Sequence, residues 1–182
     1  MRKRVLRFFT IADFEEEEIW LRKMHGKGWK LVGMAPPCFY SFEACEPEDV
    51  IYRLDYKDSK QTPDYMQMLS DFGWEYFEEC AGWLYFRKPA KDVQAQEDGE
   101  LFSDRESKVD FVARIVKTRL LPLALIFLGC VIPNFLRLFS GSGADAVDKG
   151  LGIFFGVMFI IYSFLITYCG IKLAKIRKRI DK

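Results

Sequence analysis

The residues best suited to acid–base chemistry in this 182-residue chain are a run of four glutamates, Glu15–Glu18, and the only histidine, His25. Such carboxylates could attract a basic partner or a metal ion, and a histidine could act as a general base. Consecutive carboxylates on a helix point in different directions, and near the start of a helix its dipole stabilises them. We therefore expect a solvated helix face, and we expect His25, which no motif ties to a nucleophile, at the surface.

Thiol or metal chemistry would require a different pattern of cysteines. The five cysteines are Cys38, Cys45, Cys80, Cys130 and Cys169, and none of them forms a C-x-x-C pair. With a single histidine, the usual zinc spacings are absent. The sequence also contains no phosphate-binding loop, dinucleotide fingerprint or paired-acid signature. We expect reduced thiols, no metal, no cofactor and no enzymatic activity.

Aromatic side chains are the remaining candidates for a binding site. Trp20, Trp29, Tyr40, Trp74 and Trp83 could contact a ligand or a partner, although aromatics at helix and strand spacing more often form a core. Basic residues between aromatics can indicate nucleic acid binding. Residues 1–110, however, carry 16 Lys and Arg against 23 Asp and Glu, and this excess of negative charge repels phosphate. Direct nucleic acid binding is not expected.

The elements that carry these aromatics form an internal repeat. Two units, about residues 3–45 and 49–88, align at an offset of 45 residues. The alignment matches Trp20 with Tyr65, Gly28-Trp29 with Gly73-Trp74, and Phe39-Tyr40 with Leu84-Tyr85. Because Trp20 and Tyr65 occupy the same place in their helices, we expect both to face a sheet, and Trp29 and Trp74 to be equivalent.

Each unit predicts the order strand, helix, strand, strand. In the first unit, Asp13 is a plausible N-cap and Gly28 stands where a left-handed residue ends the helix. In the second unit, Thr62-Pro63 starts the helix and Ala81-Gly82 makes a tight turn. The sequence therefore predicts a duplicated β-α-β-β domain of class α+β over residues 1–90, with helices covering one sheet face in a ferredoxin-like manner.

After a polar segment at residues 91–107, expected to be a linker, the chain changes character. Residues 111–182 carry 11 Lys and Arg against 3 Asp and Glu, and they contain two uncharged stretches, Leu120–Leu136 and Gly150–Ile171. The first is short for a hydrocarbon core of ~30 Å and reaches Ser140 only if Arg137 snorkels. Although a buried helical hairpin in a soluble protein is the alternative, we predict a two-helix transmembrane hairpin in residues 108–182, with spans of about 120–140 and 150–171.

Positive charges next to the two stretches predict the orientation. Lys and Arg collect on the cytoplasmic side of a membrane. They precede the first span and follow the second, whereas the connecting loop, Ser140–Lys149, has one Lys and two Asp. We expect a multi-pass protein of the cell membrane with both termini in the cytoplasm.

Four residues within the spans could affect how these helices fold and assemble. Pro133 is tolerated better in a membrane helix than in a soluble one, and Asn134 is expected near the outer interface or bonded to the other helix. Gly152 and Gly156 form a small-x-x-x-small spacing that could support close helix packing.

A combination of residues in the first unit resembles the DUF2812 family. The pattern W-L-x-x-M-x-x-K-G-W-x-L is matched by residues 20–31, and it continues in Phe39-Tyr40-Ser41-Phe42 and Tyr52-Arg53-Leu54-Asp55-Tyr56. In the second unit Asp71-Phe72-Gly73 replaces the x-K-G step. The resemblance covers about residues 3–88. It implies an uncharacterised protein of Gram-positive bacteria, often with C-terminal membrane spans and often encoded near PadR-like transcriptional regulators, and it implies no catalytic residues.

Two functions fit these features. The first is a membrane-anchored regulatory or sensing protein whose cytoplasmic domain binds a ligand or a protein, for which a PadR-like regulator is a possible partner by the resemblance alone. The second is an accessory subunit of a membrane transport complex, in which the Gly152 and Gly156 face would pack beside a transporter subunit. Both functions require the lipid bilayer as a partner, and neither fixes the oligomeric state.

Overall fold

The computed structural model describes residues 1–36, 39–56, 63–102, 105–137 and 146–181. The chain divides into two compact units, Met1–Phe111 and Val112–Lys182. The first unit contains all the described strands, and the second contains most of the long apolar helices.

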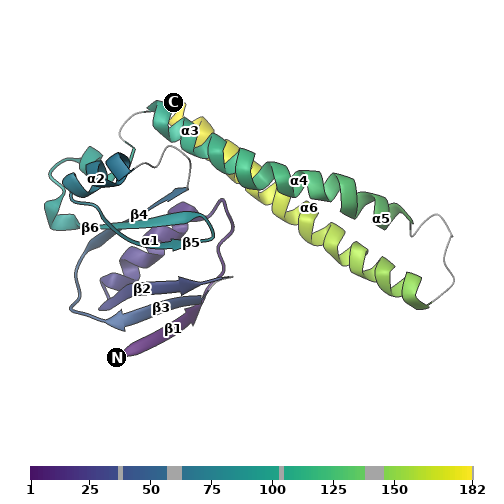
Figure 1. Ribbon diagram of the computed structural model, residues 1–182, viewed down its shortest axis with the longest axis horizontal. Helices are drawn as coiled ribbons and strands as arrows, with labels where there is room; N and C mark the ends of the chain where they lie inside the picture. Colours follow the sequence, from purple (N-terminus) through teal and green to yellow (C-terminus); the bar gives the residue numbers. More distant parts are fainter. Residues whose placement is uncertain (37–38, 57–62, 103–104, 138–145, 182) are drawn as a thin grey trace. The chain divides into compact units, whose positions relative to one another are not determined.

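The first unit is an α+β domain, as the sequence predicts. Its described strands form two antiparallel sheets of three strands each (Figure 1). We call the sheet with the order β1-β3-β2 the first sheet and the sheet with the order β4-β6-β5 the second sheet. The elements are β1 (Arg2–Leu6), α1 (Phe14–His25), β2 (Trp29–Ala35), β3 (Phe39–Ala44), β4 (Val50–Tyr56), α2 (Pro63–Asp71), β5 (Glu75–Cys80) and β6 (Trp83–Pro89).

The two halves of this domain repeat one another in detail. Both sheets have the same strand order, and each middle strand pairs with a bulged neighbour, between Leu31 and Gly33 in the first sheet and between Tyr76 and Glu78 in the second. The glycine after each helix has a positive φ, +77° at Gly28 and +81° at Gly73, as predicted for left-handed helix ends. The predicted offset of 45 residues therefore holds from the helix to the bulge.

After the connection between the last two strands of each half, the predicted alignment is wrong by one residue. Leu31 pairs with Phe42 and Tyr76 pairs with Phe86, so β3 and β6 are related by an offset of 44. Tyr40 consequently corresponds to Leu84, whereas the sequence alignment matched it to Tyr85. The cause is the connection between the last two strands, which has three residues after Ala35 in the first half and two, Ala81-Gly82, in the second.

The domain is layered, with α1 between the two sheets and α2 on the far side of the second sheet (Figure 1). The hydroxyl groups of Tyr40 in β3 and Tyr85 in β6 both donate to Glu17 Oε1 in α1, at 2.8 Å each, which places α1 in contact with both sheets. On the other face of the second sheet, α2 closes a hydrophobic core. This core consists of Ile51, Leu69, Trp74, Leu84 and Phe86, with Tyr65 and Met66 packed against it.

Local turns follow the sequence in one case and depart from it in another. Ala81 and Gly82 have φ values of +51° and +82°, which confirms the predicted tight turn. Asp13 does precede α1, but its side chain makes no capping bond to the helix. It accepts hydrogen bonds from the backbone N and the hydroxyl of Thr10, at 2.8 and 2.6 Å, and so holds the preceding turn. The predicted capping role of Thr62 lies outside the described residues.

The segment expected to be a linker contributes to the domain over much of its length. It contains two short 3₁₀ turns, Ala90–Asp92 and Gln96–Gly99. Val93 and Leu101 pack against the core of the second half, and Glu100 pairs with Arg53 at 2.9 Å. Its polar composition hides these contacts, because its few apolar residues show no helix or strand periodicity.

The second unit is a helical hairpin. Its first arm continues from α3 (Arg105–Ile115) through a π-helical turn (Val116–Leu120), α4 (Leu121–Ile126), a second π-helical turn (Phe127–Val131) and α5 (Ile132–Arg137); its second arm is α6 (Ala146–Ile180). Each π-helical turn contains the residue four positions before a proline, Thr118 before Pro122 and Gly129 before Pro133. A proline has no N–H and collides with the carbonyl four residues back, so a wider turn accommodates it.

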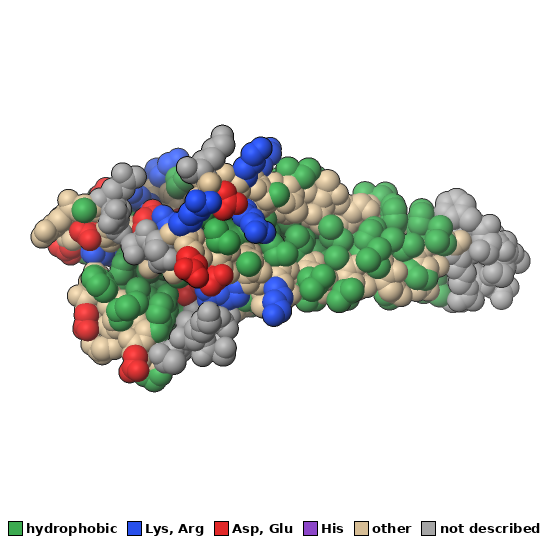
Figure 2. All heavy atoms as spheres, turned by 90° about the horizontal axis from the view of Figure 1, so that it is seen from above, with side chains coloured by type: hydrophobic (Ala, Val, Ile, Leu, Met, Phe, Trp, Pro, Cys, Tyr) green, Lys and Arg blue, Asp and Glu red, His purple; other side chains and the backbone are tan. Residues whose placement is uncertain are grey.

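Both arms of the hairpin are long and apolar enough to cross a membrane, over Arg105–Leu136 and Gly150–Ile180, by length and composition. Hydrophobic side chains run along the hairpin surface (Figure 2). Exposed ones include Leu121, Leu125, Leu128, Ile153, Ile160 and Phe164. The loop predicted at Ser140–Lys149 lies largely outside the described residues.

Inside the hairpin, the two arms meet through aromatic rings and a glycine. The rings of Phe135 and Phe159 are stacked with centroids 4.5 Å apart, and Phe127 also contacts Phe159. A Cβ on Gly156 would lie 3.9 Å from the Phe135 ring, so this glycine faces the chain's own first arm. The side-chain amide of Asn134 donates a hydrogen bond to the carbonyl of Cys130, at 2.8 Å, within its own helix. This bond satisfies the amide N–H without a partner on the other helix.

Candidate functional site

Helix α1 carries both candidate sites of the domain, one on its inward faces and one on its solvent face. Inward, Glu17, Glu18, Leu21 and His25 are all buried. They recur at the three- and four-residue spacing that brings side chains to neighbouring faces of a helix. The expectations of a solvated glutamate face and of a surface histidine are therefore wrong for Glu17, Glu18 and His25, because a second sheet covers the side of α1 that would otherwise face water.

Glu17 lies between the two sheets with a tyrosine on either side. Its Oε1 accepts the hydroxyl hydrogen bonds of Tyr40 and Tyr85, at 2.8 Å each. Burial raises the pKa of Glu17, and the two hydrogen bonds oppose this effect by favouring the carboxylate. Burial also raises the pKa of Tyr85, and the neighbouring carboxylate adds to it. The arrangement ties α1 to both sheets through one carboxylate.

Glu18 closes the edge of the second sheet. Its Oε1 accepts the backbone N–H of Leu54 at 2.8 Å, and its Oε2 receives the Arg53 guanidinium at 3.1 Å. Since β4 is an edge strand, this N–H has no neighbouring strand to bond, and the carboxylate supplies the acceptor. Burial raises the pKa of Glu18 to about 8, against the opposing effects of Arg53 and the Leu54 hydrogen bond. Glu18 is therefore a group that can exchange a proton near neutral pH.

His25 ends the inward row. Its Nδ1 is hydrogen-bonded to the Tyr52 hydroxyl at 2.8 Å. Burial lowers the pKa of His25, and the nearby Arg87 lowers it further, so the ring is held neutral. Burial raises the pKa of Tyr52 to about 12. Arg87 itself bonds Glu75 and the carbonyl of Leu31, so it joins the two sheets at the same end of α1.

These inward groups hold one another through hydrogen bonds. Each carboxylate and ring described above has a hydrogen-bond partner at 3.1 Å or less. Across the described residues, no group of three or more His, Cys, Asp or Glu side chains gathers as a metal site would require.

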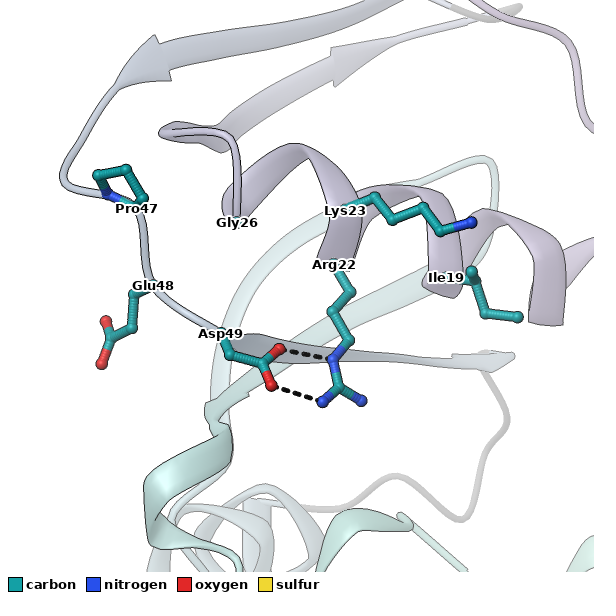
Figure 3. A pocket seen from close by; sticks show the side chains of 7 residues that line it. All are labelled: Ile19, Arg22, Lys23, Gly26, Pro47, Glu48 and Asp49. Carbon is teal, nitrogen blue, oxygen red and sulfur yellow. Dashed lines mark hydrogen bonds and ion pairs between the residues drawn. The ribbon is translucent and has the colours of Figure 1, made fainter.

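The solvent side of α1 forms one wall of an open groove with a volume of about 560 Å³ (Figure 3). The opposite wall is the segment before β4. The groove is lined by Ile19, Arg22, Lys23 and Gly26 from α1 and by Pro47, Glu48 and Asp49 from that segment. It is thus an open cleft with an apolar residue at each end, Pro47 and Ile19, and with charges of both signs between them (Figure 3).

A bidentate ion pair crosses this groove. Arg22 Nε and Nη2 donate to the two carboxylate oxygens of Asp49, at 2.6 Å each. These bonds lower the pKa of Asp49 and raise the pKa of Arg22. The side chains of both residues are about half exposed, so water and ligands reach them. An incoming carboxylate or phosphate can take the place of Asp49 on the guanidinium, whose fork matches such groups.

The structure brings together two of the five aromatic residues that the sequence singles out. Trp20 and Tyr40 meet edge to face at 4.9 Å, and Phe9 joins them. The guanidinium of Arg7 lies 4.9 Å from the Trp20 ring. Trp20 therefore faces the first sheet, as predicted, and it is half-buried at the end where Arg7 covers it.

The other three aromatics are apart from this cluster. Trp83 packs between Phe14 and Tyr56, Trp74 is buried in the core of the second half, and the half-buried Trp29 lies under the ammonium of Lys3 at 3.8 Å. None of the five lines the groove of Figure 3. A ligand role for these aromatics stays a prediction, as does the role of Gly152 and Gly156 in assembly.

Sequence reasoning missed the groove because its key contact joins residues 27 positions apart. Arg22 lies within the family-like pattern at residues 20–31, but as a variable position, and Asp49 lies between the two repeat units. The signal that could have found it is the charge pattern of α1, which has acidic residues in its first turn and places Arg22 and Lys23 in its last turn.

Comparison with known proteins gives one match. The family model described as "Protein of unknown function (DUF2812)" matches residues 13–124, from the start of α1 into α4. No curated protein and no solved structure matches the chain. The matched region is longer than the resemblance at residues 3–88 and takes in the beginning of the first apolar arm.

Proposed function

The chain belongs to the DUF2812 family, and from this premise we propose that it is a membrane-anchored regulatory or sensing protein whose α+β domain binds a ligand or a protein partner in the cytoplasm. The observation that carries the proposal is the combination in one chain of a domain with an open charged groove and two helices apolar enough to cross a membrane. A binding domain held at a membrane reports the presence of its ligand at that place.

Anchoring is supported by the surface of the hairpin. Large apolar side chains are exposed along both arms, and a lipid environment removes them from water. Basic residues lie at the two ends of the hairpin that are distant from its connecting loop. They are Arg114, Lys117 and Arg119 before the first apolar stretch and Lys172, Lys175, Arg177, Lys178 and Arg179 after the second. This distribution favours both termini in the cytoplasm and the connecting loop outside.

The fold proposed for the domain is a duplication of one β-α-β-β unit. The matching strand orders, bulges and left-handed glycines support it. In each unit the helix covers the same face of its own sheet, since Trp20 contacts Phe42 in the first half and Tyr65 packs near Phe86 in the second. A helix on one face of an antiparallel sheet with this strand order is ferredoxin-like packing at the level of the single unit.

The groove suits a partner that presents an acidic group. Arg22 and Lys23 supply the positive charge, and the exposed Ile19 supplies an apolar contact beside them. A peptide segment of a PadR-like regulator, a candidate by the family resemblance, or a small carboxylate ligand would each use this chemistry. The alternative of an accessory transport subunit would use the glycines of α6, of which Gly156 already faces Phe135 of its own chain.

The experiment is affinity purification of the tagged full chain from its native membranes in mild detergent, followed by mass spectrometry of bound proteins and small molecules. Wild type and Lys27→Ala, an exposed charge outside the groove lining, should retain the same partner, and Arg22→Ala should lose it. Equal recovery by all three chains, or no bound molecule with any of them, would contradict the groove as the binding site.

Orientation is tested separately. A reporter enzyme that is active only outside the cytoplasm should be active when inserted in the Ser140–Lys149 loop and inactive at either terminus. Activity at the N-terminus would place the domain outside the cell and would end the cytoplasmic proposal.

A further inference from the structure

The layers of the domain are uneven. The second sheet has α2 on one face and α1 on the other, and α1 has a sheet on both sides (Figure 1). By contrast, among the described residues of the first unit, the first sheet has a helix on one face alone, and α2 has a sheet on one side alone. Within that unit, the described residues therefore leave one sheet face without a helix and one helix face without a sheet.

The open face of the first sheet is defined by its register. Arg2 pairs with Glu43, Arg4 with Ser41 and Leu6 with Phe39, and these six side chains share one face. We call them the open face. Leu6 and Phe39 are 66% and 44% exposed, and Arg2 and Arg4 are exposed beside them. Lys30 extends the open face onto β2, where it also pairs with Glu43.

The internal repeat shows what kind of element this face accepts. With the offset of 44 residues between β3 and β6, Phe39, Ser41 and Glu43 correspond to Trp83, Tyr85 and Arg87. On the neighbouring strand β1, the open-face residues Arg2, Arg4 and Leu6 correspond to Tyr52, Leu54 and Tyr56 of β4. In the second sheet this is the face that α1 covers, through Phe14, Glu17 and His25. The open face is thus the equivalent of a helix-binding face.

The uncovered side of α2 complements the open face. With 100° per residue, the side of α2 opposite the buried Leu69 carries Asp64, Gln67 and Asp71. All three are exposed, Met68 beside them is 45% exposed, and Phe72, which directly follows the last residue of α2, is 64% exposed. The open face is basic with two apolar residues at one end, whereas this side of α2 is acidic with two apolar residues along one flank. Opposite charges of this kind select a partner and an orientation.

We propose that the open face binds α2 of a second copy of this chain, so that chains associate head to tail. Each added copy continues the alternation of helix and sheet that exists inside one domain. The contact is heterologous, because the two surfaces belong to different parts of the chain. Where copies share a bilayer through their apolar helices, their high effective concentration lets a small interface suffice. This association does not depend on what the groove of α1 binds.

The first test is disulfide trapping of the full chain in liposomes, with the five native cysteines replaced. One chain carries Ser41→Cys at the centre of the open face, and a differently tagged chain carries Gln67→Cys on α2. The expected product after mild oxidation is the mixed dimer. Replacing Gln67→Cys by Lys23→Cys, which is exposed on α1, provides the matched control and should give none. A dimer formed mainly between two Ser41→Cys chains would mean a symmetric contact and would overturn the proposal.

Charge reversal provides the second test. Arg4→Glu in the Ser41→Cys chain and Asp71→Lys in the Gln67→Cys chain should each abolish the mixed dimer, and the two changes together should restore it. Loss without restoration would overturn the proposal. A second result would also overturn it: the mixed dimer is unaffected by Asp71→Lys, and Arg4→Glu reduces it only when the liposomes contain anionic lipid. That result would assign the open face to the membrane surface.

Discussion

The two halves of the α+β domain follow one plan, but they differ in what covers them. Strand β4 is buried at every residue except Arg53, whereas β1 alternates between exposed and half-buried residues. The reason is the position of α1, which packs against both sheets. The second sheet therefore has α1 on one face and its own helix α2 on the other, whereas α1 covers one face of the first sheet. Equivalent residues of a repeat therefore contribute unequally to stability, and substitutions at paired positions measure the difference.

Truncating the tryptophan of each repeated glycine–tryptophan step should give the largest difference between the two halves in the free energy of unfolding. Trp74 is 4% exposed in the core of the second half, and its equivalent Trp29 is half-buried. Trp74→Ala is expected to lower the free energy of unfolding by about 3–5 kcal/mol, the usual effect of truncating a buried large aromatic. Trp29→Ala is expected to lower it by roughly 1–2 kcal/mol, in proportion to its smaller buried area. Denaturant unfolding of the detergent-solubilised chain, followed by circular dichroism, measures both. Equal losses would contradict the unequal burial of the two tryptophans as the cause.

Glu18 should make stability depend on pH in the direction opposite to most carboxylates. Its folded-state pKa is raised from 4.5 to about 8, so between these values the folded chain holds a proton that the unfolded chain has released. Stability is greatest at the acidic end of this range and falls as pH rises through about 8. Each pKa unit corresponds to about 1.4 kcal/mol, so the fall amounts to a few kcal/mol.

Glu18→Gln provides the control for this pH dependence. The amide oxygen can still accept the Leu54 N–H, and the group no longer titrates. Melting temperatures of the variant should change much less between pH 5 and 8 than those of wild type. A wild-type melting temperature that rises over the same range would show that Arg53 keeps Glu18 ionised at all these pH values.

The two left-handed glycines should differ because their surroundings differ. An added Cβ at Gly28 would lie 2.9 Å from the carbonyl oxygen of Cys45, whereas at Gly73 it would lie 3.5 Å from the flexible side chain of Lys88. Left-handed geometry alone costs an alanine about 1–2 kcal/mol. Gly73→Ala should therefore lose about that amount, and Gly28→Ala should lose more, because the backbone at Cys45 must move. The same unfolding measurement ranks them, and the reverse order would contradict this account.

Much of this fold is readable from the sequence, because local patterns specify it. The repeated helix stripe, the glycine–tryptophan steps and the Ala81-Gly82 turn each depend on neighbouring residues, and all of them have the predicted structure. The prediction failed where tertiary contacts decide. Glu17, Glu18 and His25 are polar by type, and nothing local indicates that a sheet from the other half will cover them.

The candidate groove was beyond sequence reasoning for the same reason. It depends on the meeting of Arg22 and Asp49, which the connection between the two repeat units brings about. The error of one residue in the alignment of the last strands has a related cause. An alignment without a gap ignores the one-residue difference in loop length, and it then matches residues that point to opposite faces of their sheets. The strand pairs assign the register, since Leu31 pairs with Phe42 and Tyr76 pairs with Phe86.

The smallest difference in stability is expected between two glutamates that each pair with an arginine on a neighbouring strand of the same sheet. Glu75 bonds Arg87, whose side chain is 9% exposed, whereas Glu43 bonds the largely exposed Arg2 at 3.3 Å. Glu43→Gln should change the free energy of unfolding by less than about 0.5 kcal/mol, as for most exposed pairs. Glu75→Gln should cost about 1 kcal/mol, because a buried guanidinium loses its charged partner.

The pH dependence of the Glu75 effect gives a sharper test than its size. Hydrogen bonding to Arg87 lowers the pKa of Glu75, so this carboxylate stabilises the fold above its unfolded-state pKa and loses its contribution as pH falls through the lowered value. The gap between wild type and Glu75→Gln should accordingly close at acid pH, where the Glu18 contribution is at its greatest. A gap that stays constant from pH 7 to pH 3 would show that Glu75 acts through packing alone, and that its charge pairing with Arg87 within the second sheet adds no stability.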